Sequence, residues 1–400
     1  MIHHHAFYEA LGSMDEHSAK WASVLAGLSV MRLLERLLGE PDLVAVTHSD
    51  IQATRAAIEA VPKGDPARAI LFRILDRIEQ SAKPSTELGT DIIAYGRALD
   101  LEGRWHLAAD VFETVARAFP GHTHTRTVIE ASILLGAAAR SAGDWETSDR
   151  AYTRAEHLAA TINDRTLFLT AQVGMANSQM IRGNLPAAQE ELEQVIRDAT
   201  EERLEPVLQI ALHARASVAH HQHDFQKAIH LAYRSMELTT NPSARERLLT
   251  DIAAAYAELG MREVAVKAYS IVVMTSPHQW VRAQAMLNMM ELAILDGDES
   301  AYDELSRQID NAALDPKLHA YSLYFHALGS QRFGRPDAES RFDAAQSYAE
   351  SNKLNQLSFE IEKSRKEIPA PSPTVAPSDD LVPIAEMIEH LRDQARVSQA

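Results

Sequence analysis

Residues 102–112 read EGRWHLAADVF, and forty residues later residues 142–152 read AGDWETSDRAY. In each stretch a tryptophan follows the glycine by two positions, a small residue comes three positions later, and an aromatic residue four positions after that. A glycine can end a helix in the left-handed conformation, and small residues let a second helix approach to about 8–10 Å. The aromatic side chain fills the space beside that contact. The two stretches therefore predict two copies of a helix pair.

The same spacing recurs along the chain, first in steps of 40 residues and then in a step of 37. The first copy covers residues 89–120, and the sixth and seventh copies turn at Gly297 and Gly334. The residues expected to form turns or close helix contacts are Gly96, Gly103, Ala108, Phe112, Gly136, Gly143, Tyr152, Ala176, Gly183, Ala188, Ala216, Ala228, Ala253, Gly260, Ala265 and Tyr269. One helix pair cannot bury its own apolar face, so the pairs are expected to stack into an array with a continuous core.

These repeats resemble the tetratricopeptide repeat family over roughly residues 89–350. The resemblance implies an all-α fold, a right-handed superhelical solenoid of antiparallel helix pairs. The family's usual period is 34 residues, so the longer copies imply helices extended by nearly a turn at 1.5 Å per residue. Such long-period versions resemble bacterial regulators and scaffolds that sense peptides or partner proteins.

The regions outside the array have their own sequence character. Residues 1–83 are expected to form a helical capping or dimerising layer, followed by the array over residues 84–350 and the end of its last helix over 351–367. Residues 368–380 hold four prolines and predict an extended linker. Residues 381–400 predict an amphipathic helix. Asp-Pro, Asn-Pro and Ser-Pro pairs predict helix starts at Pro66, Pro242, Pro277 and Pro316.

Composition narrows the classes of function. The net charge of −17 disfavours nucleic acid and anionic membrane as partners, and the absence of cysteine suits a reducing cytoplasm. The chain contains no apparent secretory signal, membrane span or catalytic motif. We expect a cytoplasmic, non-catalytic protein without cofactor. An enzyme and a DNA-binding regulator are the less favoured alternatives.

Histidines and paired carboxylates are the candidate site residues of the sequence. His213 and His220 lie two helical turns apart, about 10 Å, which is too far for one zinc ion unless His221 or a carboxylate intervenes. A binding face or a turn that includes His223 is the favoured interpretation, and no metal site is predicted. Carboxylates such as Glu190 and Glu191 are expected on solvated helix faces.

The first helix of each pair is expected to line a concave groove that binds a protein or peptide segment. The groove residues predicted from the repeat register are Arg97, Arg140, Asn177, Ser217, His220 and Asn288, with Glu291 nearby. The two arginines would grip a carboxylate, and Asn177 would hold peptide backbone. The alternative is a regulatory sensor in which the C-terminal helix is the output element. Self-association through the N-terminal helices is a further expectation.

Overall fold

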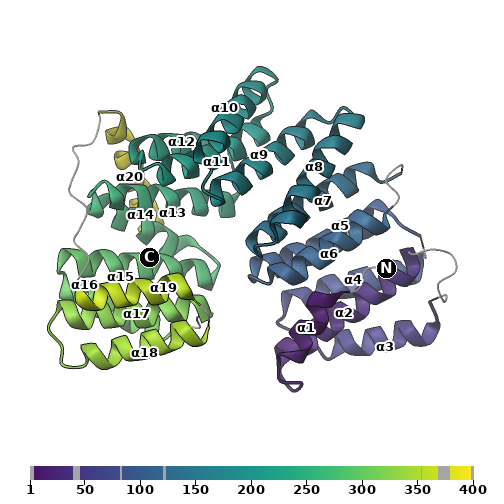
Figure 1. The fold of residues 1–400 in the computed structure, drawn as a ribbon, viewed down its shortest axis with the longest axis horizontal. Helices are drawn as coiled ribbons and strands as arrows, with labels where there is room; N and C mark the ends of the chain where they lie inside the picture. The colour runs from purple at the N-terminus through teal and green to yellow at the C-terminus, as the bar shows by residue number, and fades with distance from the viewer. Residues whose placement is uncertain are drawn as a thin grey trace. The chain divides into compact units, whose positions relative to one another are not determined.

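The computed structural model describes residues 4–38, 46–81, 83–119, 123–312, 314, 316–352, 354–367 and 379–397. Within these residues every regular element is a helix (Figure 1). The chain divides into two compact units, Met1–Val207 and Leu208–Ala400. In both units most helices pack mainly against their neighbours in sequence. The predicted all-helical repeat architecture is therefore present.

The described residues of the first unit contain ten complete helices and the first residues of an eleventh. They are α1 (His5–Gly12), α2 (Ala19–Leu38), α3 (His48–Glu59), α4 (Pro66–Gln80), α5 (Thr86–Leu101), α6 (Trp105–Ala118), α7 (Thr125–Ser141), α8 (Trp145–Thr161), α9 (Arg165–Ile181), α10 (Leu185–Glu201) and α11 (Glu205–His221). The pairs α5–α6, α7–α8 and α9–α10 are the first three predicted copies. The first helices of these pairs also contact one another, α5 with α7 and α7 with α9. This layer is the surface on which a groove was predicted.

The 40-residue period has a simple structural origin. Each of the helices α7 to α11 is 17 residues long, and three-residue turns separate them. The middle residue of every turn is left-handed: Gly143, Asn163, Gly183, Arg203 and His223 have φ of 80°, 53°, 84°, 56° and 60°. The residue after it donates a backbone hydrogen bond to the carbonyl five positions earlier, as in the bond of 2.9 Å from Asp144 N to Ala139 O. The repeating unit is thus one helix and one turn, used twice per copy.

Glycine allows the close approach of helices within a pair. A β-carbon at position 96 would collide with the ring of Phe112, and one at position 136 would lie 2.8 Å from three ring atoms of Tyr152. Gly174, which the repeat register did not single out, faces the same tyrosine ring from the next pair. The aromatic residue of one copy therefore packs against glycines of two copies.

The N-terminal region shares a core with the first repeats. One apolar cluster runs from Phe7 on α1 to Ala151 on α8, and both α1 and α2 contact α6. The His4 ring also hydrogen-bonds Asp110 on α6 at 2.5 Å. Helices α1 and α2 therefore pack against the first repeats, while the capping role and the self-association of residues 1–83 stay predictions.

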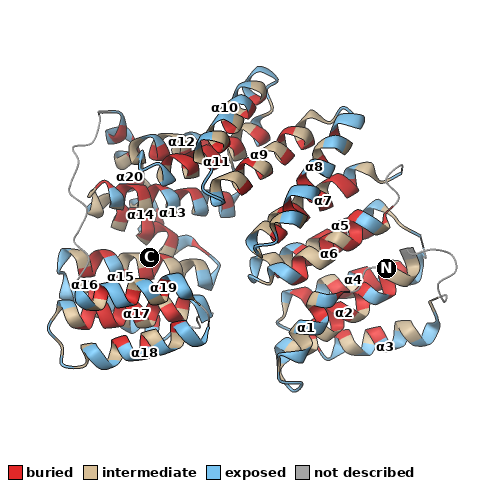
Figure 2. Cartoon of the chain, in the orientation of Figure 1, coloured by how far each residue is buried: buried red, intermediate tan, exposed pale blue. Residues whose placement is uncertain are grey.

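The second unit continues the pattern of helix pairs. Its further helices are α12 (Phe225–Glu237), α13 (Pro242–Glu258), α14 (Arg262–Thr275), α15 (Gln279–Asp296), α16 (Glu299–Asp310), α17 (Pro316–Arg332), α18 (Ala338–Ser351), α19 (Asn355–Lys366) and α20 (Val382–Val397), the last preceded by a short 3₁₀ helix, η1 (Asp379–Leu381). Buried residues lie where neighbouring helices face one another, and exposed residues cover the outer faces (Figure 2). The first helices again form a layer, with α15 in contact with α17 and α17 with α19.

The C-terminal helix packs against its own unit. Leu381, Ile384 and Ile388 join the apolar cluster of α12 to α14, and α20 contacts α14 along its length. The hydroxyl of Tyr256 on α13 donates a hydrogen bond of 3.1 Å to the carbonyl of Leu381. Residues 368–378 of the predicted linker and 398–400 of the predicted helix lie outside the described residues.

Two predicted boundaries need correction. Residues 351–367, expected to end the last helix, instead contain the separate helix α19, because the chain closes a turn there with a bond of 2.9 Å from Leu354 N to Ala349 O. Pro277 starts no helix, since α15 begins at Gln279, after an N-cap residue that follows the proline. The starts at Pro66 and Pro242 are confirmed, each capped by the preceding side chain. Helix α17 begins at Pro316, although its predicted cap, Asp315, lies outside the described residues.

Candidate functional site

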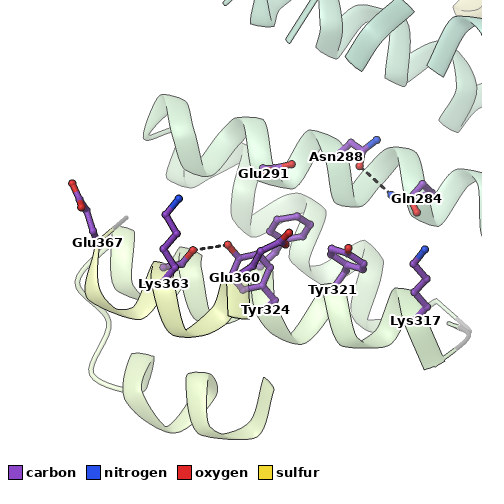
Figure 3. Close-up of a pocket in the computed structure, with 11 residues that line it drawn as sticks. Gln284, Asn288, Glu291, Lys317, Tyr321, Tyr324, Glu360, Lys363 and Glu367 are labelled. Carbon is purple, nitrogen blue, oxygen red and sulfur yellow. Dashed lines mark hydrogen bonds between the residues drawn. The ribbon is translucent and has the colours of Figure 1, made fainter. Parts of the chain in front are cut away.

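A hollow lies within the second unit, on the layer formed by α15, α17 and α19 (Figure 3). Its volume is about 780 Å³. The residues that line it are Gln284, Asn288, Glu291, Lys317, Tyr321, Tyr324, Phe325, Glu360, Lys363, Ser364 and Glu367. We refer to it as the α15/α17/α19 pocket.

Helical periodicity places these side chains on one face of each helix. On α15 the lining positions 284, 288 and 291 are four and three residues apart, and on α17 positions 317, 321 and 324 repeat the same spacing. Residues three and four apart share a helix face. Because each of the three helices contacts the next one in the layer, the three faces meet around one hollow.

The wall on α17 is aromatic and rigidly held. Tyr324 is 7% exposed, and its hydroxyl shares a hydrogen bond of 2.7 Å with the hydroxyl of the buried Ser364 on α19. Phe325 is 5% exposed and packs beside it. Tyr321, one turn earlier, is half-buried. These rings give the pocket an apolar surface with fixed orientation.

Polar groups of α15 form the opposite wall. Gln284 Nε2 donates a hydrogen bond of 3.1 Å to Asn288 Oδ1, so the two amides are aligned along the helix (Figure 3). Each amide group both donates and accepts hydrogen bonds. The pair can therefore recognise the backbone of a bound segment.

The carboxylates make the middle of the pocket electronegative. Desolvation, followed by the negative charges of Glu258 and Glu360, raises the pKa of Glu291 to about 7. The Glu291 side chain reaches solvent, yet surrounding helices displace much of the water around it because it stands on a concave wall. Burial raises the pKa of Tyr321 and of Tyr324, and the charges of Glu291 and Glu360 contribute to both shifts. The two carboxylates and the two rings therefore share one electrostatic environment.

Lysines stand at the two ends of the pocket. Lys317 projects at the end near Gln284, and Lys363 lies near Glu367 at the other end (Figure 3). Both side chains are exposed. The pocket thus has a lysine at each end, accompanied by Glu367 at the Lys363 end, and a negative, aromatic middle.

A smaller hollow of about 170 Å³ lies in the same unit and contains two of the predicted groove residues, Ser217 and His220. Burial lowers the pKa of His220, which packs edge-on against Phe225. Upstream on α11, His213 Nε2 lies 2.7 Å from a carboxylate oxygen of Asp251. Nowhere in the described part of the chain do three or more histidine or carboxylate side chains gather in a way that could hold a metal ion.

The remaining predicted groove residues lie in the first unit. Arg97 is exposed on α5 and Asn177 is half-buried on α9. Arg140 Nη1 donates to the Tyr152 hydroxyl at 3.0 Å and to the Gly174 carbonyl at 3.4 Å. Its guanidinium therefore links two helix pairs, and its role in holding a ligand carboxylate stays a prediction.

Sequence reasoning named Asn288 and Glu291 but missed most of the α15/α17/α19 pocket. Tyr321 and Tyr324 belong to a weak repeat, and Glu360 and Lys363 belong to the helix that was expected to be only the end of α18. Their three- and four-residue spacing was the available signal. The expectation that Glu191 lies on a solvated helix face is wrong: its side chain is half-buried, and desolvation followed by the charge of Glu156 raises its pKa to about 7.

No protein-family model matches the chain, and comparison with the curated proteins gives no match. In the described residues, none of the helices combines the length and apolar character needed to cross a bilayer.

Proposed function

We propose that the chain is a non-catalytic scaffold that binds an extended protein or peptide segment in the α15/α17/α19 pocket. The observation that carries this proposal is a hollow of about 780 Å³ built from the first helices of successive pairs. Pockets that hold small ligands have volumes of about 300–1,000 Å³. A few residues of a bound segment would fill this one.

The lining suits a peptide. Aligned amides on α15 can pair with its backbone, the rings of α17 offer apolar contact, and charges of both signs can select its side chains. In this proposal each unit is a tetratricopeptide-like, right-handed superhelix of a cytoplasmic protein. Further contacts for a partner would come from Arg97, Arg140 and Asn177 within the first unit and from Ser217 and His220 within the second.

Selection of random displayed peptides on the immobilised full chain tests the proposal. We expect enriched sequences that bind in solution and lose at least tenfold in affinity when Asn288→Trp fills the pocket. Gln308→Trp on the exposed face of α16 is the matched control and should bind like the parent. Failure to enrich any peptide, or equal binding by the Asn288→Trp variant after its fold is verified by circular dichroism, would contradict the proposed function.

A second candidate function is a regulatory sensor whose output element is α20. The packing of Leu381, Ile384 and Ile388 against its own unit favours it, because a tethered helix that docks on its own protein can be displaced. Hydrogen exchange of α20, with and without a selected peptide, tests this role. Loss of protection on peptide binding would support it, whereas unchanged protection would leave α20 as a structural cap.

A further inference from the structure

We propose that the middle of the α15/α17/α19 pocket is a subsite for one cationic side chain, a lysine or arginine of the bound segment, held by Glu291 and Glu360 beside the rings of Tyr321 and Tyr324. This inference rests on the proposed function and names the chemistry that the pocket selects.

The four side chains come from three helices and converge on one place. Glu291 projects from α15, Tyr321 and Tyr324 from α17, and Glu360 from α19, with Glu360 beside Tyr324 (Figure 3). A cation between them would meet two carboxylates and the negative faces of aromatic rings. Such a cation–π contact is stronger when water is excluded from it.

The chain does not neutralise these carboxylates itself. Among the described residues, no lysine, arginine or histidine forms an ion pair with Glu291 or Glu360. The amide of Gln356 donates to Glu360 at 3.2 Å but carries no charge. A ligand cation would therefore supply the opposite charge that the site lacks.

The two lysines limit how much positive charge fits. Lys317 and Lys363 lie at the ends of the pocket, with Glu367 near Lys363, so a second cation would approach one of these lysines. The site should consequently accept one basic side chain flanked by neutral or acidic residues and disfavour a run of basic residues. The preference for a single basic side chain distinguishes this subsite from the general attraction of polycations by a protein of charge −17.

Binding should depend on pH through Glu291. The ionisable groups that share its electrostatic environment are Glu258 on α13, Tyr269 on α14, Tyr321 and Tyr324 on α17, and Glu360 on α19, with Lys363 at the pocket's end. Glu291 is about half protonated near pH 7, and an arriving cation favours its ionised form. Cation binding should therefore release protons and strengthen as the pH rises from 6 to 8.

The test uses n-butylammonium, which mimics a lysine side chain, as a probe of the full chain. We expect saturable shifts of the Tyr321 and Tyr324 ring resonances in NMR spectra and a fall in the Glu291 carboxyl pKa. Sodium chloride at the same ionic strength should cause neither change.

Glu291→Gln and Glu360→Gln should each weaken the binding of n-butylammonium at least fivefold. Glu362→Gln, which replaces an exposed carboxylate of α19 outside the pocket, should change this binding less than twofold. Equal effects of sodium, or full binding by both pocket variants, would overturn the inference.

Displayed peptides separate this inference from the proposed function. If selected peptides carry one lysine or arginine whose replacement by norleucine weakens binding at least tenfold, the cation subsite and the peptide-binding function are both supported. If peptides bind the pocket but are indifferent to Glu291→Gln and Glu360→Gln, the cation subsite is wrong and the peptide-binding function remains. If n-butylammonium binds the carboxylates but no peptide is enriched, the subsite stands and the proposed function is wrong.

Discussion

The ring of Tyr152 lies against Gly174 of the next helix pair so closely that no β-carbon fits between them. On its other side the ring packs against Gly136 of its own pair, and its hydroxyl accepts a hydrogen bond from Arg140. Tyr152 is 1% exposed. One aromatic side chain thus sets the spacing within a pair and between pairs.

This packing predicts that Gly174→Ala destabilises the first unit. The added methyl group overlaps the Tyr152 ring, and overpacking of this kind costs about 1–3 kcal/mol. Gly64→Ala is the control, since an added β-carbon there meets nothing within 4 Å. Urea denaturation measures the free energy of unfolding of both variants. A Gly174→Ala protein as stable as the parent would mean that the ring moves aside freely.

The left-handed turns make a different prediction. Arg203 holds φ of 56° at a position where two equivalent turns use glycine. A non-glycine residue in this conformation costs about 1–2 kcal/mol, and glycine removes that cost while adding entropy to the unfolded chain. Arg203→Gly should raise stability by about 1 kcal/mol in thermal denaturation.

Asn163→Gly is the comparison for this prediction. Asparagine tolerates the left-handed region better than arginine does. Replacing Asn163, which has φ of 53°, by glycine should therefore raise stability by less than Arg203→Gly does. A larger gain at Asn163 than at Arg203 would contradict the assignment of the effect to backbone strain.

Arg140 and Arg97, which are both predicted groove residues, should respond differently to replacement by alanine. Arg140→Ala leaves the buried Tyr152 hydroxyl without its donor, so it should cost about 1 kcal/mol or more of stability. Arg97→Ala removes an exposed side chain and should change stability by less than about 0.5 kcal/mol. Adding Tyr152→Phe to the Arg140→Ala variant measures the coupling energy between the two side chains. Additive losses of stability would show that the hydrogen bond between Arg140 and Tyr152 contributes little.

The raised pKa of Glu191 predicts that the stability of the folded protein depends on pH. Its pKa of about 7 in the folded protein exceeds the unfolded value near 4.5, so the folded state keeps a proton that the unfolded state loses between these pH values. The stability contributed by this group therefore falls as the pH rises from about 4.5 to 7. Glu191→Gln should be more stable than the parent at pH 8 and lose this advantage below pH 4.5. Glu190→Gln, its exposed neighbour, should show no such trend across denaturation curves.

The docked C-terminal helix can be tested by truncating one side chain. Ile388 is fully buried against the second unit, and replacement of a buried isoleucine by alanine typically costs about 2–5 kcal/mol. Ile388→Ala should therefore reduce hydrogen-exchange protection throughout α20. Val397→Ala, at a position 78% exposed on the same helix, should not. Equal protection in both variants would mean that Ile388 does not anchor the helix.

The sequence by itself determined the helical pairs and their register. Turn and packing residues recur in it at fixed spacing because left-handed turns and close helix contacts admit few residue types, as at Gly143 and Gly136. Capping side chains such as Asp65 and Asn241 are equally local, so their helix starts could be predicted. The separate helix α19 could not, since its turn lacks the repeat's recognisable glycine and tryptophan.

Only the tertiary structure decided which polar residues meet. Tyr324 and Glu360 lie on different helices, and their proximity follows from how α17 packs on α19, which no short stretch of sequence encodes. The same holds for Arg140, whose repeat position pointed to a groove but whose guanidinium reaches a tyrosine hydroxyl of its own pair and a carbonyl of the next. Adjacent residues Glu190 and Glu191 also differ: Glu190 is exposed, whereas Glu191 is half-buried and has its pKa raised by desolvation and by the charge of Glu156. Backbone conformation depends on local residue types, whereas desolvation and charge depend on everything packed around a group.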